Sequence, residues 1–410
     1  MQDATGVPRP VHRVRAARVA VGMLFFVNAL ALTTVLPRLP QIKADLGLTN
    51  TALGLALAAA PVGSLVAVPM TGRLIARFGS AAVAAVAGTA LGLGLPLLAL
   101  APSGIALAAT YLALGAADGV MDAAMNAHGL RVQQQYGRSL INGMHGLWSV
   151  GAAAGAATGT AAAAFGVPLG LHLGVVGLLT LGGAAAAAVG RLPGPDPADL
   201  TAHSAGGPMA GRSEGVGAGQ RARGVRTAMR ALLWVGVLSV LAGIGEDVAG
   251  TWSTVYLADG RGAAPGIAGL GYTCFAAAMV LSRFAADRVT DRLGVVAVAR
   301  AGGLLAMLGY ALVLVSPTVG LAVAGFAVIG LGVAPAFPAL FHAAGHWPGV
   351  RSGDGVTVVS WVARMGFLVT PPLVGLVADT AGIAAGLVLG GAAVGTYGML
   401  AGRLRPGARR

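Results

Sequence analysis

The sequence predicts an all-α polytopic membrane protein whose twelve transmembrane helices form two six-helix bundles. Hydrophobic residues make up 56% of the 410 residues and charged residues only 10%, whereas a soluble domain carries roughly 25% charged residues. The apolar residues gather into twelve stretches of about the 20 residues that a helix needs to cross a bilayer. One long polar stretch, residues 191–228, separates six of these stretches from the other six.

Short turns that contain Pro or Gly separate neighbouring spans. We expect the spans at residues 17–36, 50–71, 80–101, 104–128, 141–165, 168–190, 229–257, 265–286, 295–316, 318–341, 354–378 and 381–403. The expected organisation is a tail at 1–16, an N-terminal bundle at 17–190, a flexible linker at 191–228, a C-terminal bundle at 229–403 and a tail at 404–410.

The positions of Lys and Arg predict the orientation of the chain. Arg38, Lys43 and Arg261 fall on one side of the spans, Arg364 falls within a span, and the remaining basic residues fall on the other side. Cytoplasmic loops are enriched in Lys and Arg. We therefore expect a multi-pass protein of the cell (inner or plasma) membrane with both termini in the cytoplasm. The same asymmetry accounts for the net charge of +13 without a nucleic-acid partner.

The two halves look duplicated at an offset of 215 residues. The segment GRLIARFG at 72–79 aligns with DRVTDRLG at 287–294. One offset that holds across a whole half indicates an internal repeat. It also pairs Gly54 with Gly269, Gly115 with Gly330 and Gly151 with Gly366.

Six plus six spans, a central linker and a basic turn after the second span of each half resemble the major facilitator superfamily, whose members are transporters built from repeats. The segments that carry DAAMNAHG, HGLWSVG, GEDVAGTWSTVYL and ARMGFLVTPPLVG are similar to the fucose-permease-like branch of bacterial permeases. The sequence departs from the pattern of that branch at Asp118, Asp247 and Thr251. The resemblance implies cytoplasmic gating loops at Gly72, Arg73, Arg77, Gly79, Asp287, Arg288 and Arg292.

The fourth and fifth predicted spans hold the densest set of polar residues. Asp118, Asp122 and Asn126 recur at steps of four and share one stripe of a helix, while His145 and Trp148 share a face of the next helix. Carboxylates inside a membrane usually face a bundle interior or a water-filled cavity. We expect Asp122 to be the main proton carrier, tuned by His145 and Asn126, with Asp118 nearer the midplane. The alternatives are a polar patch that only joins two helices, and a static Asp–His pair.

The seventh and eleventh predicted spans carry the charges of the second half. Glu246 and Asp247 are adjacent and point about 100° apart, so both cannot face the cavity equally. The resemblance to the permease branch implies that Glu246 is the one that faces it, which makes Glu246 a further proton-coupling candidate. An unpaired Arg364 would be very costly. We expect it to pair with an intramembrane acid, with Asp247 as a candidate, or to bind an anionic group of the substrate.

Candidate substrate contacts combine amide and aromatic side chains. Asn28 could donate to a substrate or to a neighbouring helix, and Trp252 could stack on a sugar-like ring or lie in the interfacial belt. The belt is also expected for Tyr256, and a loop end for His128. The substrate-binding candidates are Asn28, Asn126, Trp148, Trp252 and Trp361.

The tenth predicted span contains Pro335 and Pro338. Proline lacks a backbone N–H and breaks or bends a helix. A discontinuous helix suits a moving gate or the lining of a transport site.

These features predict a secondary active transporter that moves a small solute, with a sugar-like molecule as a candidate, by proton-coupled symport through alternating access. The expected partners are the substrate, protons and the lipid bilayer, and the expected state is a monomer without a cofactor or metal. The alternative is a proton-driven drug or metabolite efflux antiporter, because Gly146, Gly155 and Gly159 fit the glycine spacing of such proteins, although Thr160 replaces the final proline.

An intramembrane enzyme or receptor is the third hypothesis. The sequence contains no His-Glu-x-x-His zinc motif, and its one cysteine, Cys274, forms no metal cluster with histidines and no intrachain disulfide. Lys43 is the only lysine and follows no glycine-rich loop, which excludes an ATP-driven pump with a P-loop. We therefore expect no enzyme activity.

The orientation can be tested with a reporter enzyme that is active only outside the cytoplasm. Fused after Gly217, within the expected linker, the reporter should be silent, because the basic residues place the linker in the cytoplasm. The same reporter fused after Gly166, in an expected outer turn, should be active and serves as the control. Activity after Gly217 would show that the orientation is reversed.

Overall fold

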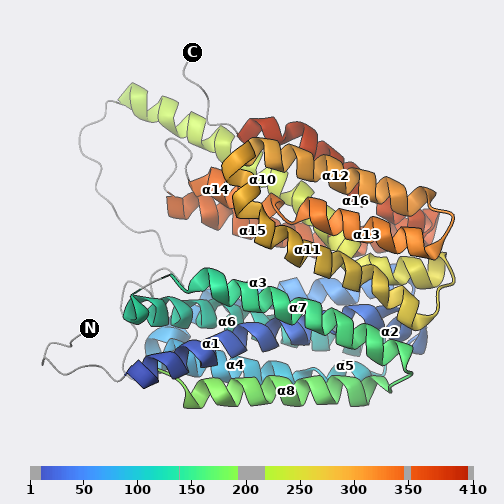
Figure 1. Ribbon diagram of the computed structural model, residues 1–410, viewed down its shortest axis with the longest axis horizontal. Helices are drawn as coiled ribbons and strands as arrows, with labels where there is room; N and C mark the ends of the chain where they lie inside the picture. Colours follow the sequence, from blue (N-terminus) through green and yellow to red (C-terminus); the bar gives the residue numbers. More distant parts are fainter. Residues whose placement is uncertain (1–10, 138, 193–217, 346–351, 405–410) are drawn as a thin grey trace, which may run out of the picture.

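The computed structural model describes residues 11–137, 139–192, 218–345 and 352–404, and the regular elements of these residues are all helices (Figure 1). The helices from α1 to α8 pack chiefly against one another in an N-terminal bundle, and those from α10 to α16 do so in a C-terminal bundle. The expected all-α fold is confirmed.

The N-terminal bundle consists of α1 (Val11–Thr33), η1 (Leu36–Arg38), α2 (Leu39–Asp45), α3 (Asn50–Phe78), α4 (Ser80–Gly94), α5 (Leu97–Leu100), α6 (Gly104–Tyr136), α7 (Ile141–Ala164) and α8 (Leu169–Val189). The C-terminal bundle consists of α10 (Ala218–Val255), η2 (Tyr256–Gly260), α11 (Pro265–Leu293), α12 (Val295–Val315), α13 (Val319–Val333), α14 (Ala336–Gly345), α15 (Ser352–Ala381), α16 (Ile383–Leu400) and η3 (Ala401–Leu404).

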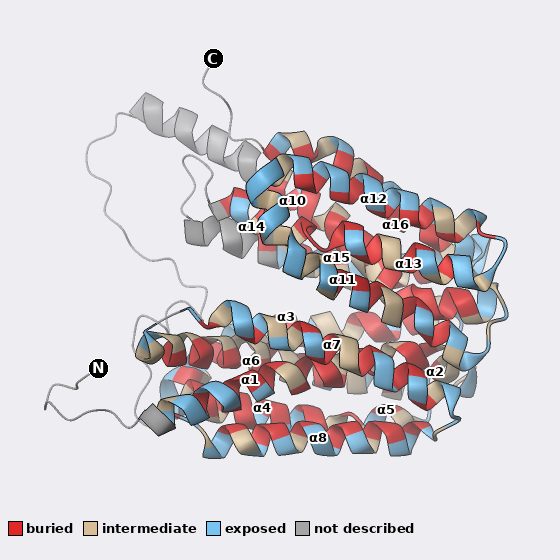
Figure 2. Cartoon of the chain, in the orientation of Figure 1, coloured by how far each residue is buried: buried red, intermediate tan, exposed pale blue. Residues whose placement is uncertain are grey.

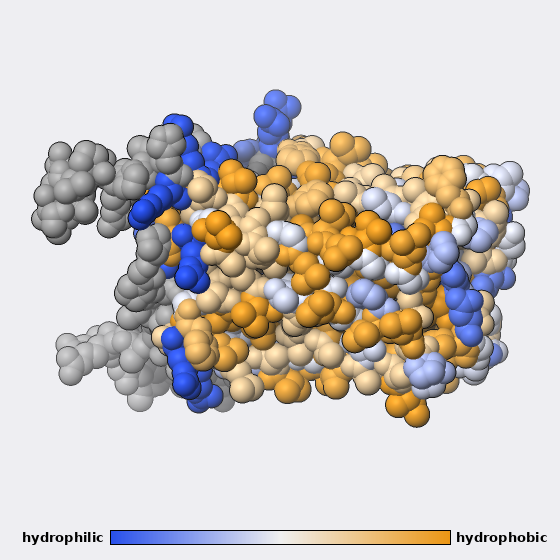
Figure 3. All heavy atoms as spheres, turned by 90° about the horizontal axis from the view of Figure 1, so that it is seen from below, coloured by the Kyte–Doolittle hydropathy of each residue, from blue (hydrophilic) through white to orange (hydrophobic). Residues whose placement is uncertain are grey.

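Eleven helical segments within the described residues are long and apolar enough to cross a membrane. The predicted fifth span, α7, is not among the eleven, because its glycines and polar residues lower its mean hydropathy. It is nevertheless 24 residues long and packs against α1. The face drawn in Figure 3 has a broad apolar band between two hydrophilic ends, as a bilayer requires.

The outward faces of the helices are apolar. On α8, Leu171, Leu178 and Leu179 are exposed, whereas Gly177 and Gly183 are buried. Figure 2 shows exposed and buried residues alternating along this helix. Large apolar side chains outside match the acyl chains of lipid, and small residues inside let helices approach closely.

Several helices extend beyond the predicted spans. α3 continues to Phe78, α6 to Tyr136 and α11 to Leu293. α10 already begins at Ala218, within the linker expected at 191–228. Span prediction counts apolar residues, but Arg, Gln and Ala are good helix formers and can continue a helix outside lipid. Residues 193–217 of the expected linker lie outside the described residues.

The turns of the two bundles repeat at the offset of 215 residues. Gly79 ends α3 with φ 83° and Gly294 ends α11 with φ 80°. Gly47 and Gly262 have φ values of 59° and 63°. Positive φ values are strained for residues with a side chain. The matched backbone supports the duplication inferred from the sequence.

The close helix crossings repeat at the same offset. A side chain on Gly115 of α6 would overlap the carbonyl oxygen of Ala60 of α3. A side chain on Gly330 of α13 would overlap the carbonyl oxygen of Phe275 of α11. Both members of each crossing are separated from their counterparts by 215 residues. The two bundles are therefore built on one repeated backbone plan.

The bundles are joined at one end, which we call the closed end. The ion pair between Lys43 and Asp259 connects α2 to η2 there. The carboxylate of Asp379, near the end of α15, accepts backbone N–H hydrogen bonds from Asn50 and Thr51 at 2.9 and 2.8 Å. These donors lie in the first turn of α3, where free N–H groups and the helix dipole favour a negative charge. A carboxylate of one bundle thus caps a helix of the other.

Two further helix pairs connect the bundles in a symmetric way. α3 packs on α15, and α7 packs on α11. Gly54 of α3 lies against the backbone of Pro371, and its counterpart Gly269 of α11 lies against Thr160 of α7. The hydroxyl oxygens of Thr160 and Thr273 are 2.8 Å apart across the second contact.

The predicted break in the tenth span is confirmed. α13 ends at Val333, and α14 begins at Ala336 after Pro335. By contrast, α15 continues through Pro371 and Pro372.

Replacing Gly115 tests the close crossing of α3 and α6. Gly115→Ala should lower the free energy of unfolding by about 1–3 kcal/mol, because the new methyl group meets backbone rather than a movable side chain. Gly182→Ala is the control, since nothing lies within 4 Å of a Cβ at that position. Both changes gain the same helix propensity. Equal melting temperatures of the two variants in detergent would contradict the crossing.

Replacing Asp379 tests the closed end. Asp379→Ala should shift the protein toward opening of this end, because three hydrogen bonds between the bundles are lost. Spin labels at the exposed residues Ile105 and Val315, in a variant without Cys274, would report the distance between the bundles at this end. Thr380→Ala is the control, since its hydroxyl bonds only within α15. An unchanged distance distribution in Asp379→Ala would exclude a closing role for the carboxylate.

Candidate functional site

The polar residues of α1, α6 and α7 meet inside the N-terminal bundle. The amide nitrogen of Asn28 donates to Oδ1 of Asp118 at 2.7 Å, and Nε1 of Trp148 donates to Oδ1 of Asn28 at 3.0 Å. Asn28 is 1% exposed, so both polar ends of its amide are satisfied within the bundle. The structure brings these three predicted residues together as one hydrogen-bonded chain, with Asn28 bonded to neighbouring helices.

Asp122 lies one turn further along α6. Its carboxylate accepts a hydrogen bond from Asn126 at 3.1 Å, and the same amide also donates to the carbonyl oxygen of Asp122 at 2.9 Å. His145 of α7 lies within electrostatic range of Asp122 and packs edge-on against Phe25 with ring centroids 5.1 Å apart. The imidazole is exposed, so it is accessible to solvent or solute.

Glu246 and Asp247 point in different directions, as their adjacency predicts. A carboxylate oxygen of Glu246 lies 3.9 Å from Nη2 of Arg283 on α11. Oδ1 of Asp247 accepts a hydrogen bond from Thr251 on its own helix at 3.0 Å. Asp247 also lies within electrostatic range of Tyr310, which packs inside the C-terminal bundle. Glu246 is therefore paired with a cation of its bundle, and Asp247 faces the bundle interior.

Arg364 connects the two bundles. Its Nη1 donates to Oγ of Ser64 on α3 at 2.6 Å, and its charge lies within electrostatic range of Asp118 and Asp122. Among the described residues it forms no ion pair within 4 Å, with Asp247 or with any other acid. The expected direct ion pair is absent because α15 packs against α3, whereas Asp247 faces away from that contact.

Two residues of this region were missed by sequence reasoning. Arg283 was counted with the cytoplasmic basic residues, but it is only partly exposed and pairs with Glu246. It also lies within electrostatic range of His145 in the other bundle. Ser64 carries no sequence signal of its own. A signal for Arg283 existed, because an acid such as Glu246 inside a membrane often pairs with a cation.

The tryptophan candidates occupy different surroundings. Trp361 is 45% exposed and lies three residues before Arg364, on the same face of α15. Trp252 is 0% exposed, so its ring is inaccessible to a solute in this structure. Tyr256 was expected in the interfacial belt, but it is buried and its hydroxyl donates to the carbonyl oxygen of Val313 at 3.3 Å.

Two further residues were placed wrongly at the end of the fourth span. His128 is buried, and its Nδ1 lies 3.1 Å from the hydroxyl oxygen of Ser80. Arg131 was counted with the cytoplasmic basic residues, but it is buried within α6. The helix continues, and Oε1 of Gln133 accepts hydrogen bonds from the backbone N–H groups of Leu140 and Ile141. These bonds cap the start of α7 and fix it to α6.

The expected gating segments lie at the end opposite the closed end. Gly72, Arg73 and Arg77 belong to α3, and Gly79 alone forms the turn to α4. Arg288 and Arg292 belong to α11 and are exposed, as are Arg73 and Arg77. The segments are helix ends rather than loops. The side chain of Asp287 lies outside the described part of the structure.

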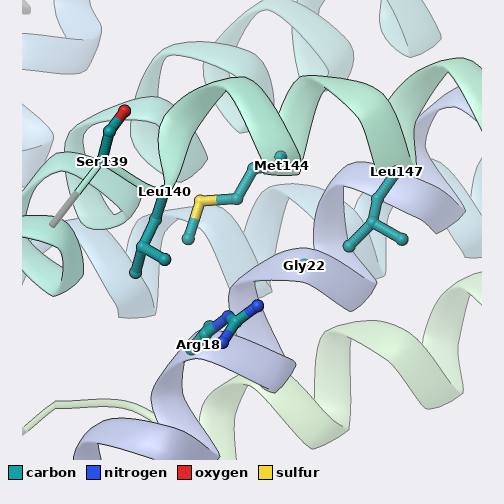
Figure 4. A pocket seen from close by; sticks show the side chains of 7 residues that line it. Arg18, Gly22, Ser139, Leu140, Met144 and Leu147 are labelled. Carbon is teal, nitrogen blue, oxygen red and sulfur yellow. The ribbon is translucent and has the colours of Figure 1, made fainter. Parts of the chain in front are cut away.

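A pocket of about 260 Å³ lies between α1 and α7 near the same end (Figure 4). It is lined by Arg18, Gly22, Ser139, Leu140, Gly143, Met144 and Leu147. The predicted site residues are not among its lining, although Met144 precedes His145 directly. The pocket therefore lies beside the polar cluster. Among the described residues, no group of three His, Cys, Asp or Glu side chains could hold a metal ion.

Comparison with known proteins places the chain in a family. The model of the Major Facilitator Superfamily matches residues 235–410. An uncharacterized MFS-type transporter of Yersinia pestis is 31% identical over 363 residues, which cover 88% of this chain and 89% of that protein. An uncharacterized transporter of Sinorhizobium fredii is 32% identical and covers 87% and 90%. The membrane protein MosC of Rhizobium meliloti is 28% identical and covers 90% and 85%.

Solved structures share the fold at low sequence identity. A mutant of the nucleoside transporter NupG has a TM-score of 0.74 at 13% identity and covers 95% of this chain and 98% of that one. A bacterial homolog of the human lysosomal transporter Spinster has a TM-score of 0.70 at 13% identity, with 97% of each chain covered. These likenesses support the fold alone, whereas the two bacterial relatives above 30% identity cover most of the sequence. The chain belongs to the major facilitator superfamily.

Proposed function

We propose that this transporter moves a small polar solute across the cell membrane by proton-coupled symport through alternating access. The observation that carries the proposal is the set of ionisable groups that lie within electrostatic range of one another across the bundles. Asp118 and Asp122 of the N-terminal bundle face Arg364 of the C-terminal bundle, and His145 faces Arg283. Ionisable residues inside a membrane mark proton relays and substrate pathways.

The closed end is proposed to face the outside of the cell. The opposite end carries the exposed arginines Arg73, Arg77, Arg288 and Arg292, which favours a cytoplasmic position. In this orientation the structure represents a state closed to the outside. The linker and both termini are then cytoplasmic.

Asp122 is proposed to be the proton carrier. Among the described residues its side-chain hydrogen bond comes from Asn126 of its own helix, while Asp118 is held by Asn28 of α1. The carboxylate with its partner on the same helix can change protonation without breaking a contact between helices. A neutral Asp122 removes a bare charge from the water-poor state that the protein must cross, so protonation favours that crossing.

The solute is proposed to bind beside this cluster, between the bundles. Repeat-built transporters place the substrate near the midplane at the repeat interface. Trp148 and the exposed Trp361 supply aromatic faces, and His145 and Asn126 supply polar groups. Aromatic and amide side chains suit a hydroxylated, sugar-like ring. The structural relatives include nucleoside and organic anion transporters, which shows that the fold accepts polar solutes of several kinds.

The efflux alternative rests on the glycines of α7, and packing accounts for two of them. A side chain on Gly155 would overlap Thr33, and one on Gly159 would overlap the carbonyl oxygen of Thr34. These glycines let α7 approach α1 closely. These two glycines therefore give no separate support for an antiporter. A transport measurement distinguishes symport from antiport.

Asp122→Asn tests the proton carrier, because it mimics the protonated form. Proteoliposomes with this variant should retain exchange of solute between equal pools and lose accumulation driven by a pH gradient. One proton per solute lets a gradient of one pH unit drive about a tenfold accumulation, so the expected loss is about tenfold. Asp291→Asn, a change of an exposed acid on α11, should accumulate solute like the unchanged protein.

The outcome separates three cases. Continued accumulation by Asp122→Asn would show that Asp122 has only a structural role. Asp118 or Glu246 would then be the proton carrier. Accumulation in the opposite direction to the proton gradient in the unchanged protein would establish the antiporter. Accumulation without any dependence on the gradient would exclude proton coupling.

A further inference from the structure

We propose that the transported solute is a monocarboxylate, bound through the guanidinium of Arg364, and that it replaces an aspartate as the counter-ion of this arginine. The proposal rests on the proposed transport function and names the substrate class of the same site. Its basis is the way the carboxylates and guanidinium groups share their hydrogen bonds.

The carboxylates of the site take their described hydrogen bonds from amides. Asp118 is bonded to Asn28 and Asp122 to Asn126. Arg364 lies within electrostatic range of both acids, but its described hydrogen bond goes to the neutral hydroxyl of Ser64. The acids therefore balance the charge of the guanidinium without occupying its donors.

A guanidinium group carries five N–H donors in a planar fork that matches a carboxylate. Within the described parts of the chain, the bond to Ser64 uses one donor of Arg364 and leaves the others open to a ligand. Arg283 lies 3.9 Å from Glu246, which is beyond hydrogen-bonding distance. Two arginines of the C-terminal bundle thus have charge partners nearby and donors to spare, which is the arrangement that binds an anion.

The surroundings of Arg364 suit an organic anion rather than a small inorganic ion. Trp361 lies three residues earlier on the same face of α15 and is 45% exposed. Gly119 of α6 has no side chain, and a Cβ there would overlap Oγ of Ser64. The glycine therefore lets α3 present the serine to Arg364 close to the two aspartates. A carboxylate on Arg364 would place the rest of the solute beside the Trp361 ring.

Charge balance gives the coupling rule. In the empty protein, one ionised aspartate balances Arg364 while the other aspartate carries a proton. When the ionised aspartate takes up a proton, a monocarboxylate can balance Arg364 in its place, and the net charge of the site returns to its starting value. The empty and fully loaded forms can therefore cross the water-poor state at similar cost, whereas a form with only the proton or only the solute carries an unbalanced charge. One proton accompanies one monoanion, and transport is electroneutral.

The test uses the full-length protein and matched pairs of solutes. Binding of D-gluconate and D-glucuronate, with neutral D-glucose and dianionic glucose 6-phosphate beside them, is measured by tryptophan fluorescence and thermal shift. A wider set of monocarboxylates, each with its neutral amide, is screened in the same way. We expect a monocarboxylate to bind at least about tenfold more tightly than its neutral partner, because hydrogen bonds to charged groups are the stronger ones.

The variants assign the binding to Arg364. Arg364→Gln should weaken binding of that monocarboxylate at least about tenfold, and Arg364→Lys should restore only part of it, since lysine keeps the charge but not the fork. Arg300→Gln, a change of an exposed arginine of α12, should bind like the unchanged protein. Monodisperse, folded Arg364→Gln that binds the anion normally would overturn the proposal.

The pH dependence of binding is a second readout, independent of that variant's folding. Binding to the unchanged protein should strengthen as the pH falls, because the solute and a proton bind together. In Asp122→Asn the binding should become much less dependent on pH, since the competing charge is gone. Binding that is equally pH-dependent in both proteins would exclude competition with Asp122.

Transport in proteoliposomes separates failure of this inference from failure of the proposed function. Uptake of the monocarboxylate should alkalinise the outer solution and produce no current on a supported membrane. Proton-coupled uptake of a neutral solute with a measurable current would support proton symport but would overturn the proposal that the solute is a monocarboxylate. Binding and transport of no monocarboxylate in the set would also overturn it. Uptake without proton movement would reject both.

Discussion

The structure depends on one constraint, which is that charges between the bundles must be balanced where water is scarce. Asn28 and Asn126 hold the carboxylates of Asp118 and Asp122, so neither acid needs an arginine for its hydrogen bonds. The arginine opposite, Arg364, is then balanced at a distance and remains available. Direct Arg–Asp ion pairs would hold the bundles together, because separating a desolvated pair leaves an uncompensated buried charge on each side.

The internal repeat supplies the scaffold, and its departures from symmetry supply the chemistry. Close crossings and turn glycines recur at the offset of 215 residues. At the same offset, Asp122 corresponds to Phe337, and Arg364 corresponds to Ser149, which bonds to the carbonyl oxygen of His145 on its own helix. The acid and the guanidinium that face each other across the bundles therefore each lack a charged counterpart in the other half.

Sequence reasoning predicted the parts of this design that periodicity encodes. The stripe of Asp118, Asp122 and Asn126 and the break at Pro335 follow from helical spacing and proline chemistry, and the structure contains both. The direction of Glu246 relative to Asp247 follows from the 100° step of a helix. These features needed no knowledge of which helices are neighbours.

The positions of the residues that sequence reasoning misplaced depend on tertiary contacts or on helices that continue beyond the membrane-spanning segment. Arg131 lies on a helix that continues beyond its predicted span, and Arg283 lies near the end of the span predicted at 265–286, so a count of loop charges assigned both to the cytoplasmic side. Tyr256 begins η2, and it is buried together with the adjoining end of α10, where Thr254 donates a hydrogen bond to Leu36 of the other bundle. The aromatic character of Tyr256 suggested an interface, but the packing of this segment makes it a core residue.

The pair of helices α3 and α15 links the site to the closed end. Arg364 and Asp379 lie on α15 and contact Ser64 and the start of α3. Pro371 and Pro372 lie between these two contacts, where Gly54 packs on the Pro371 backbone.

Proline removes a hydrogen bond from the helix interior and allows it to bend. The two parts of α15 can therefore move separately about the crossing with Gly54. Asp379 can therefore hold the closed end to α3 while the part of α15 that carries Arg364 moves.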